Sequence, residues 1–175
     1  DTERDAILLR SGVEQRRVTP LKTFLRTWRR SDYWGFIVLR PEELPVDVDR
    51  QRYQKAVAAL EKAGRTEEAT TAWKMAISQW PGNPVALFGL GNIELSLGND
   101  PEAEAYVRAV VERDAKSVAA RNTRAIALAR QGRYAEAMQE LSIAREDASD
   151  PAIAAELADT EALIVELSRD AAAPD

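Results

Sequence analysis

Apolar residues recur through the second half of the chain at the three- and four-residue spacing of helices that bury one face. A glycine interrupts this pattern at Gly64, Gly98 and Gly132, so that successive interruptions lie 34 residues apart. Each glycine is expected to end a helix in a left-handed backbone conformation, and a second helix follows it. The pattern therefore predicts three consecutive helical hairpins: residues 50–83, 84–117 and 118–151.

Small side chains recur at the same period in both helices of each predicted hairpin, where they would let the two backbones approach closely. They are Val57, Gly91 and Ala125 in the first helices and Ala69, Ala103 and Ala137 in the second helices. A glycine inside a helix costs roughly 1 kcal/mol relative to alanine. We expect close packing to offset that cost at Gly91. The sequence gives no comparable reason for a second glycine in the same helix, Gly89.

A unit of two helices repeated every 34 residues has the spacing of the tetratricopeptide repeat. Residues 50–149 resemble three such repeats, through LGN at 90–92, QGRYAEA at 131–137 and Pro81. The resemblance implies a mainly α fold, a solenoid of helical hairpins. Arg124 departs from the family, since a leucine normally faces the neighbouring helix there, and this predicts weaker packing inside the third repeat.

The remaining boundaries follow from the same pattern. Asp150 and Pro151 form a helix-start signature, so residues 150–170 are predicted to form a helix that covers the open edge of the last repeat. The repeat region is then 46–149, and residues 171–175 are a tail.

In the tetratricopeptide family the first helix of each repeat lines a concave groove that holds a peptide or a partner helix. The resemblance implies that the groove is lined by Gln54, Ala58, Phe88, Asn92, Leu95, Asn122, Ile126 and Arg130. Phe88 and Asn92 can equally well cover the neighbouring repeat. Members that clamp a terminal carboxylate have Lys and Arg at the inner positions, whereas this chain has Phe88 and Ala119 there, which disfavours a carboxylate ligand.

The first 45 residues follow a different pattern. DAILLRSG and EQRRVT predict a hairpin, and a helix from Thr19 would have an apolar stripe and a basic face. The stripe consists of Leu21, Phe24, Leu25 and Trp28. Residues 33–39 are apolar at both parities, which predicts a strand buried on both faces. These elements are too few to cover that strand, so a polypeptide outside this chain, the repeats or a second copy must complete the sheet.

This segment resembles the end of a papain-like cysteine peptidase domain of the bacteriocin-processing type. The resemblance rests on ILLRSG at 7–12, TPLKTFLRTWRRSDYW at 19–34 and GFIVLRPEELP at 35–45. It implies an alternative function, in which this chain is the C-terminal part of a peptidase and the repeats recruit its substrate. The catalytic cysteine and histidine would then lie in a missing N-terminal portion, and the bacterial envelope or periplasm would be the location. Asp1 is not an initiator methionine, which also predicts a longer parent protein.

Composition narrows the chemistry open to the chain itself. It contains no cysteine and no histidine, which removes thiol nucleophiles, the usual proton shuttle and the commonest transition-metal ligands. The adjacent carboxylates Glu42/Glu43 and Glu67/Glu68 have no apolar shelter and are expected to lie on the solvated surface. We therefore predict no catalytic residue, no metal and no cofactor in this chain. No apolar run is long enough to span a membrane.

Charge is distributed unevenly. The net charge is −5, with +4 in residues 1–40 and −9 in residues 41–175. A basic helix face can bind phosphates, but no aromatic residue is interleaved on that face, so solvent or the acidic repeats are its expected partners rather than nucleic acid. The predicted function is a protein-interaction module without chemistry, whose partner is a protein or peptide. The unpaired sheet would also permit a homo-oligomer.

Overall fold

The computed structural model describes residues 5–11, 13–32, 38–45 and 47–172. Its elements fall into two compact units, residues 1–38 and 39–175. In chain order the elements are β1 (Ala6–Ser11), β2 (Glu14–Pro20), α1 (Leu21–Trp28), the short 3-10 helix η1 (Arg29–Ser31), α2 (Arg50–Lys62), α3 (Thr66–Gln79), α4 (Pro84–Ser96), α5 (Asp100–Val111), α6 (Val118–Arg130), α7 (Tyr134–Asp147) and α8 (Pro151–Ala172).

The N-terminal unit contains the predicted hairpin and helix. Strands β1 and β2 pair antiparallel, with Leu8 opposite Val18, and α1 follows directly. In this unit Ala6 is buried, while Leu8, Val18 and Leu25 are exposed. Most of the strand predicted at 33–39 lies outside the described residues.

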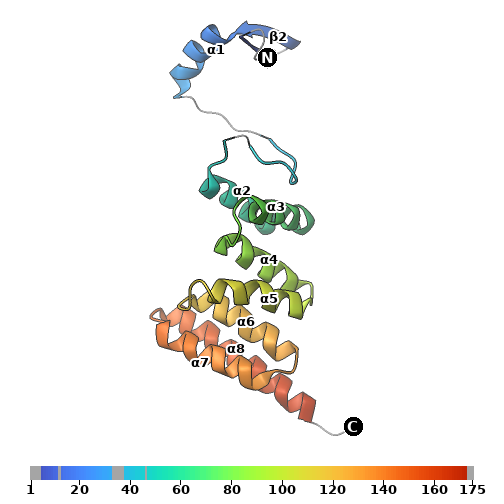
Figure 1. The fold of residues 1–175 in the computed structure, drawn as a ribbon, viewed down its shortest axis with the longest axis vertical. Helices are drawn as coiled ribbons and strands as arrows, with labels where there is room; N and C mark the ends of the chain where they lie inside the picture. Colours follow the sequence, from blue (N-terminus) through green and yellow to red (C-terminus); the bar gives the residue numbers. More distant parts are fainter. Residues whose placement is uncertain (1–4, 12, 33–37, 46, 173–175) are drawn as a thin grey trace. The chain divides into compact units, whose positions relative to one another are not determined.

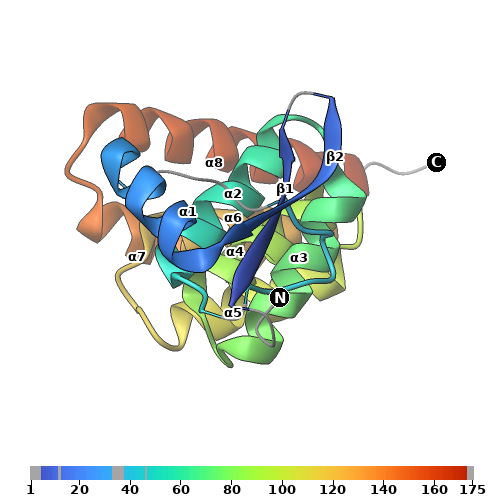
Figure 2. The same cartoon turned by 90° about the horizontal axis from the view of Figure 1, so that it is seen from above.

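The C-terminal unit is a stack of helical hairpins, which confirms the predicted solenoid fold. The pairs α2–α3, α4–α5 and α6–α7 follow one another along the stack, and α8 packs on both α6 and α7 (Figure 1). Figure 2 looks along the stack, and the first helices α2, α4 and α6 overlie one another there. Leu157 and Ile164 of α8 join the core cluster of the last hairpin, so this helix covers its apolar edge.

The three hairpins turn in the same way. Gly64, Gly98 and Gly132 have φ of +73°, +80° and +77°, and the amide after each glycine donates to a carbonyl in the last turn of the preceding helix at 2.9–3.0 Å. A Cβ added at any of these three positions would meet no atom within 4 Å. The left-handed backbone, rather than lack of space, is therefore what requires glycine here.

Small residues line the contacts between helices. Ala69, Ala103, Ala125 and Ala137 have no exposed surface. In α4 a Cβ added to Gly91 would lie 2.5 Å from Cγ1 of Val107 on α5, and one added to Gly89 would lie 2.5 Å from Nε1 of Trp73 on α3. Helix α4 thus uses one glycine against each neighbouring helix, and the buried Trp73 indole explains Gly89.

The third hairpin has a polar interior where the sequence predicted weaker packing. Arg124 Nε lies 3.1 Å from Glu104 Oε1 on α5, and Arg124 Nη1 lies 2.7 Å from Glu140 Oε1 on α7. The other oxygen of Glu140 is 2.5 Å from Arg121 Nη1. All four side chains are at most 18% exposed. The arginine at the leucine position is therefore paired on both sides and joins three helices.

Gly89→Ala is expected to destabilise the chain by up to about 2 kcal/mol, because overpacking costs about 1–3 kcal/mol while alanine regains roughly 1 kcal/mol of helix propensity. Urea unfolding measures the change. In a Trp73→Phe background the smaller ring leaves room, and the same alanine should cost less. An alanine that stabilises the Trp73 protein would contradict the close contact.

Glu140→Gln is expected to lower the free energy of unfolding by about 3 kcal/mol, because it leaves Arg121 and Arg124 buried without their shared carboxylate. The matched control is Glu136→Gln, which breaks a more exposed pair with Arg133 on the same helix and should cost less than about 1 kcal/mol. Equal losses in urea unfolding would show that the interior pairs have no special weight.

Candidate functional site

Side-chain hydrogen bonds join successive first helices along one side of the stack. Gln54 Nε2 donates to Asn83 Oδ1, which caps α4, at 2.9 Å. Thr123 Oγ1 donates to Asn92 Oδ1 at 3.2 Å, and Asn122 Nδ2 donates to Glu156 Oε1 of α8 at 3.1 Å. We call this side the first-helix face, and it comprises Gln54, Ala58, Glu61, Val85, Phe88, Asn92, Leu95, Asn122, Ile126, Arg130 and Glu156.

The middle of the first-helix face is apolar. Val85 is 48% exposed, and Phe88, Leu95 and Ile126 are half-buried. Phe88 also packs against the core cluster of Leu87, Val110, Val111 and Ala120. One side of its ring therefore supports the repeat, and the remaining surface is exposed to solvent. Gln54 and Asn92 are half-buried beside this patch and Ala58 is exposed.

Two predicted groove residues connect helices. Asn122 is only 6% exposed, and its Oδ1 is buried with no hydrogen-bond partner among the described residues. Arg130 donates through Nη1 to the carbonyl of Leu95 at 3.0 Å and lies 3.6 Å from Asp100 Oδ1. Both side chains are thus engaged with a neighbouring helix.

The first-helix face also includes two acidic residues, Glu61 and Glu156. The family resemblance places Glu61 at a groove position, whereas sequence reasoning did not select Glu156. Glu156 follows Asn122 by 34 residues, so extending the repeat period once more, into α8, would have found it. Glu61 lies on the same face of α2, but nothing in the sequence distinguishes it from the many other surface carboxylates.

Glu61 forms one wall of a hollow in this face. The hollow has a volume of about 200 Å³ and is lined by Glu61, Thr66, Asn92, Ile93 and Ser96. These residues come from the end of α2, the start of α3 and the last turns of α4. The hollow therefore lies between the first and second hairpins, beside the predicted groove residue Asn92.

A hydrogen bond from the core fixes the orientation of the Glu61 side chain. The buried Trp73 on α3 donates its indole N–H to Glu61 Oε1. The same indole occupies the space that a side chain at position 89 would need. Trp73 thus connects the carboxylate in the hollow to the close packing of α3 against α4.

Local contacts shift the pKa values of other side chains in the C-terminal unit. Burial raises the pKa of Tyr53, whose hydroxyl donates to the Ala72 carbonyl at 3.0 Å. The hydrogen bond from Arg145 lowers the pKa of Glu161, and this pair links α7 to α8. These contacts hold neighbouring helices together.

The described residues include no group of three or more His, Cys, Asp or Glu side chains that could hold a metal ion. Within the same part of the chain, no helix combines the length and apolar character needed to cross a bilayer.

Stacked helical hairpins with one face built from their first helices define a helical-repeat protein. A tetratricopeptide repeat family model matches residues 55–118 and 101–152, more than half of the chain. The chain therefore belongs to the tetratricopeptide repeat family. A search of curated protein sequences gives no significant match.

Several solved structures share this fold at low identity. The TPR domain of P58(IPK) is 20% identical, with a TM-score of 0.62 over 70% of this chain, which spans only 34% of that structure. The Yersinia enterocolitica type III secretion chaperone SycD, in complex with a peptide of the translocator YopD, is 17% identical, with a TM-score of 0.61 over 69% of this chain and 96% of that one. The TPR2B domain of yeast Sti1, in a complex with pHsp70, is 19% identical, with a TM-score of 0.59 over 69% of this chain and 97% of that one.

Proposed function

We propose that this chain is a protein-interaction module that holds a peptide or a partner helix along the first-helix face and performs no chemistry of its own. The main support is the accessible apolar surface of Val85, Phe88 and Leu95 beside the amides of Gln54 and Asn92. Burial of apolar surface drives association, and amides fix the register of a bound backbone. The complexes of SycD and Sti1 add support from proteins of the same fold.

Within this proposal the predicted groove residues divide into two roles. Asn122 is buried and Arg130 donates to the Leu95 carbonyl, so these two residues hold helices in register. Gln54 and Asn92 also bond within the chain, but each through one polar atom only and from a half-buried position. The residues that contact the ligand in this proposal are Gln54, Ala58, Phe88, Asn92, Leu95 and Ile126. A terminal carboxylate is a poor ligand for this face, because Arg130 already binds a carbonyl and lies near Asp100.

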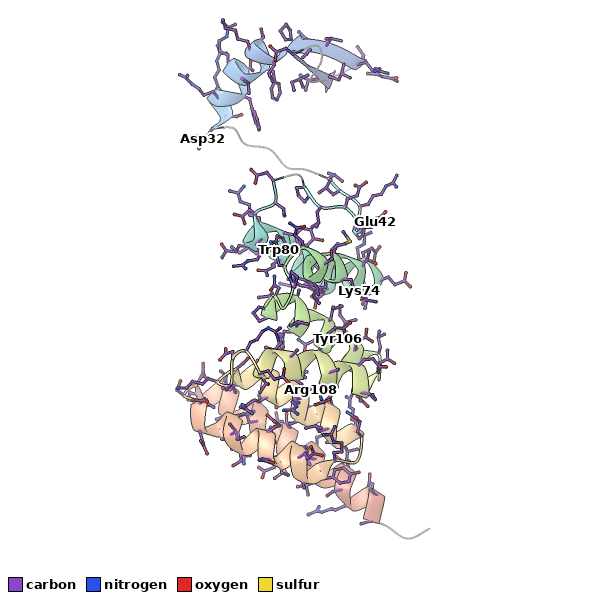
Figure 3. All side chains as sticks on the ribbon, in the orientation of Figure 1. Asp32, Glu42, Lys74, Trp80, Tyr106 and Arg108 are labelled. Carbon is purple, nitrogen blue, oxygen red and sulfur yellow. The ribbon has the colours of Figure 1, made fainter. Side chains whose placement is uncertain are left out.

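This function is tested with peptides that the full chain selects from a displayed library of random dodecapeptides. Phe88→Ala should weaken the binding of such a peptide by about tenfold, because one aromatic contact is lost. Fluorescence anisotropy measures the affinity. Val85→Ser removes an exposed side chain and should also weaken binding without lowering stability. The control is Lys74→Ala, an exposed residue of α3 (Figure 3). Equal affinities in all variants, or no selected peptide, would refute the assignment.

The resemblance of residues 1–45 to a peptidase domain supports an alternative proposal, in which the chain is the C-terminal part of a cysteine peptidase. The exposed apolar side chains Leu8, Val18 and Leu25 are compatible with a sheet that further strands complete. Those strands would come from a missing N-terminal portion or from a second copy of the chain.

A fluorogenic peptide and a thiol-directed probe, added to this chain and to its longer precursor, distinguish the two proposals. This chain has no cysteine and should give neither turnover nor labelling. Turnover and labelling confined to the precursor would support a peptidase, and an inert precursor would leave binding as the function. Turnover by this chain alone would contradict both proposals.

A further inference from the structure

Glu61 combines two features: its carboxylate lines a hollow, and it has no cationic partner among the described residues. Glu104 and Glu140 pair with arginines in the interior, and Glu136 and Glu161 pair with arginines at the surface. Within the described part of the chain no lysine or arginine forms an ion pair with Glu61. Its carboxylate is nevertheless half-buried and held in place by the Trp73 indole.

The helix ends around the hollow add further partial negative charge near Glu61. Glu61 lies in the last turn of α2 and Ser96 is the last residue of α4, so two helix C-termini, each with partial negative charge, meet there. One helix N-terminus, that of α3 at Thr66, opposes them. A carboxylate at a helix C-terminus is in an unfavourable field, and a bound cation would relieve it.

The polar groups of the hollow include acceptors with free lone pairs, beside the donors of the Thr66 hydroxyl and the Asn92 side-chain amide. The Ser96 hydroxyl donates its proton to the Ile93 carbonyl at 2.7 Å, which leaves its oxygen to accept. Glu61 has one oxygen free of the indole bond, and Asn92 Oδ1 has a second lone pair beside the one that Thr123 uses. Ammonium and guanidinium groups, which only donate, can bond to these acceptors, and the Glu61 carboxylate adds charge complementarity.

We propose that the hollow accepts a lysine or arginine side chain of the peptide bound to the first-helix face. This inference rests on the proposed function and specifies the chemistry of the ligand. A volume of about 200 Å³ exceeds the space of one water molecule, roughly 15 Å³, and admits the end of a long side chain. The ligand is then a peptide that combines apolar residues for Phe88 and Leu95 with one basic residue for Glu61.

Parallel selections from the random dodecapeptide library test this inference. The full wild-type chain should enrich lysine or arginine at one fixed position relative to the apolar residues. Glu61→Gln keeps an acceptor for the Trp73 indole but removes the charge, so the basic position should disappear while apolar residues stay enriched. The control Glu102→Gln removes one exposed charge from α5 and should retain the basic position. Thermal unfolding of each variant checks that the fold is unchanged.

Anisotropy with a matched peptide pair measures the strength of the contact. Replacing the selected basic residue by norleucine should weaken binding to the wild type by about tenfold, and to Glu61→Gln by much less. Peptides that bind wild type and Glu61→Gln alike would overturn this inference and leave the proposed function intact. Failure to select any peptide would instead refute the proposed function.

A second copy of the chain is the competing occupant. If a basic side chain of another copy filled the hollow, light scattering would give a mass above 19.4 kDa that Glu61→Gln lowers. That result would overturn the assignment to a peptide partner.

Discussion

Close approach of α4 to the helices on either side of it is the constraint on which the rest of the solenoid depends. An isolated helical hairpin cannot bury both of its apolar sides, so each one needs a neighbour in the stack. Helix α4 meets that need with a glycine towards α3 and a glycine towards α5. The helix loses propensity at both positions, and the packing of Trp73 and Val107 against it offsets the loss.

The third hairpin solves the same problem with charges instead of large apolar side chains. Arg121 and Arg124 fill the space between α5 and α7, and the carboxylates of Glu104 and Glu140 satisfy them. Such a network gains little over a hydrocarbon core of the same shape, but it tolerates the loss of any one member poorly. It therefore fixes the relative placement of three helices, which in turn fixes where Asn122 and Ile126 lie on the opposite side of α6.

The repeat period made most of the C-terminal unit predictable. Glycines at one spacing gave the turns, and alanines at the same spacing gave the helix contacts, because both depend on local residue types. The reason for Gly89 was not predictable, since it requires knowing that the Trp73 ring points at that backbone. The unpaired state of Glu61 and the burial of Asn122 were likewise hidden, because each depends on side chains from a neighbouring repeat. Glu156 could have been found by applying the period once more, to a helix that the sequence presented only as a cap.

Equivalent positions on the first-helix face have different chemistry although their backbones repeat. At one register the chain places Gln54, Phe88, Asn122 and Glu156, of which the last two bond to each other. The accessible apolar surface is consequently concentrated on α4, and the carboxylate of Glu61, which has no cationic partner among the described residues, lines a hollow together with Asn92 of the same helix α4. A ligand that covered the hollow with apolar groups would dehydrate this carboxylate, whose one partner among the described residues is the Trp73 indole, and that costs free energy. A ligand that also carries a cation removes that cost, so the arrangement of the face itself favours a mixed apolar and basic segment.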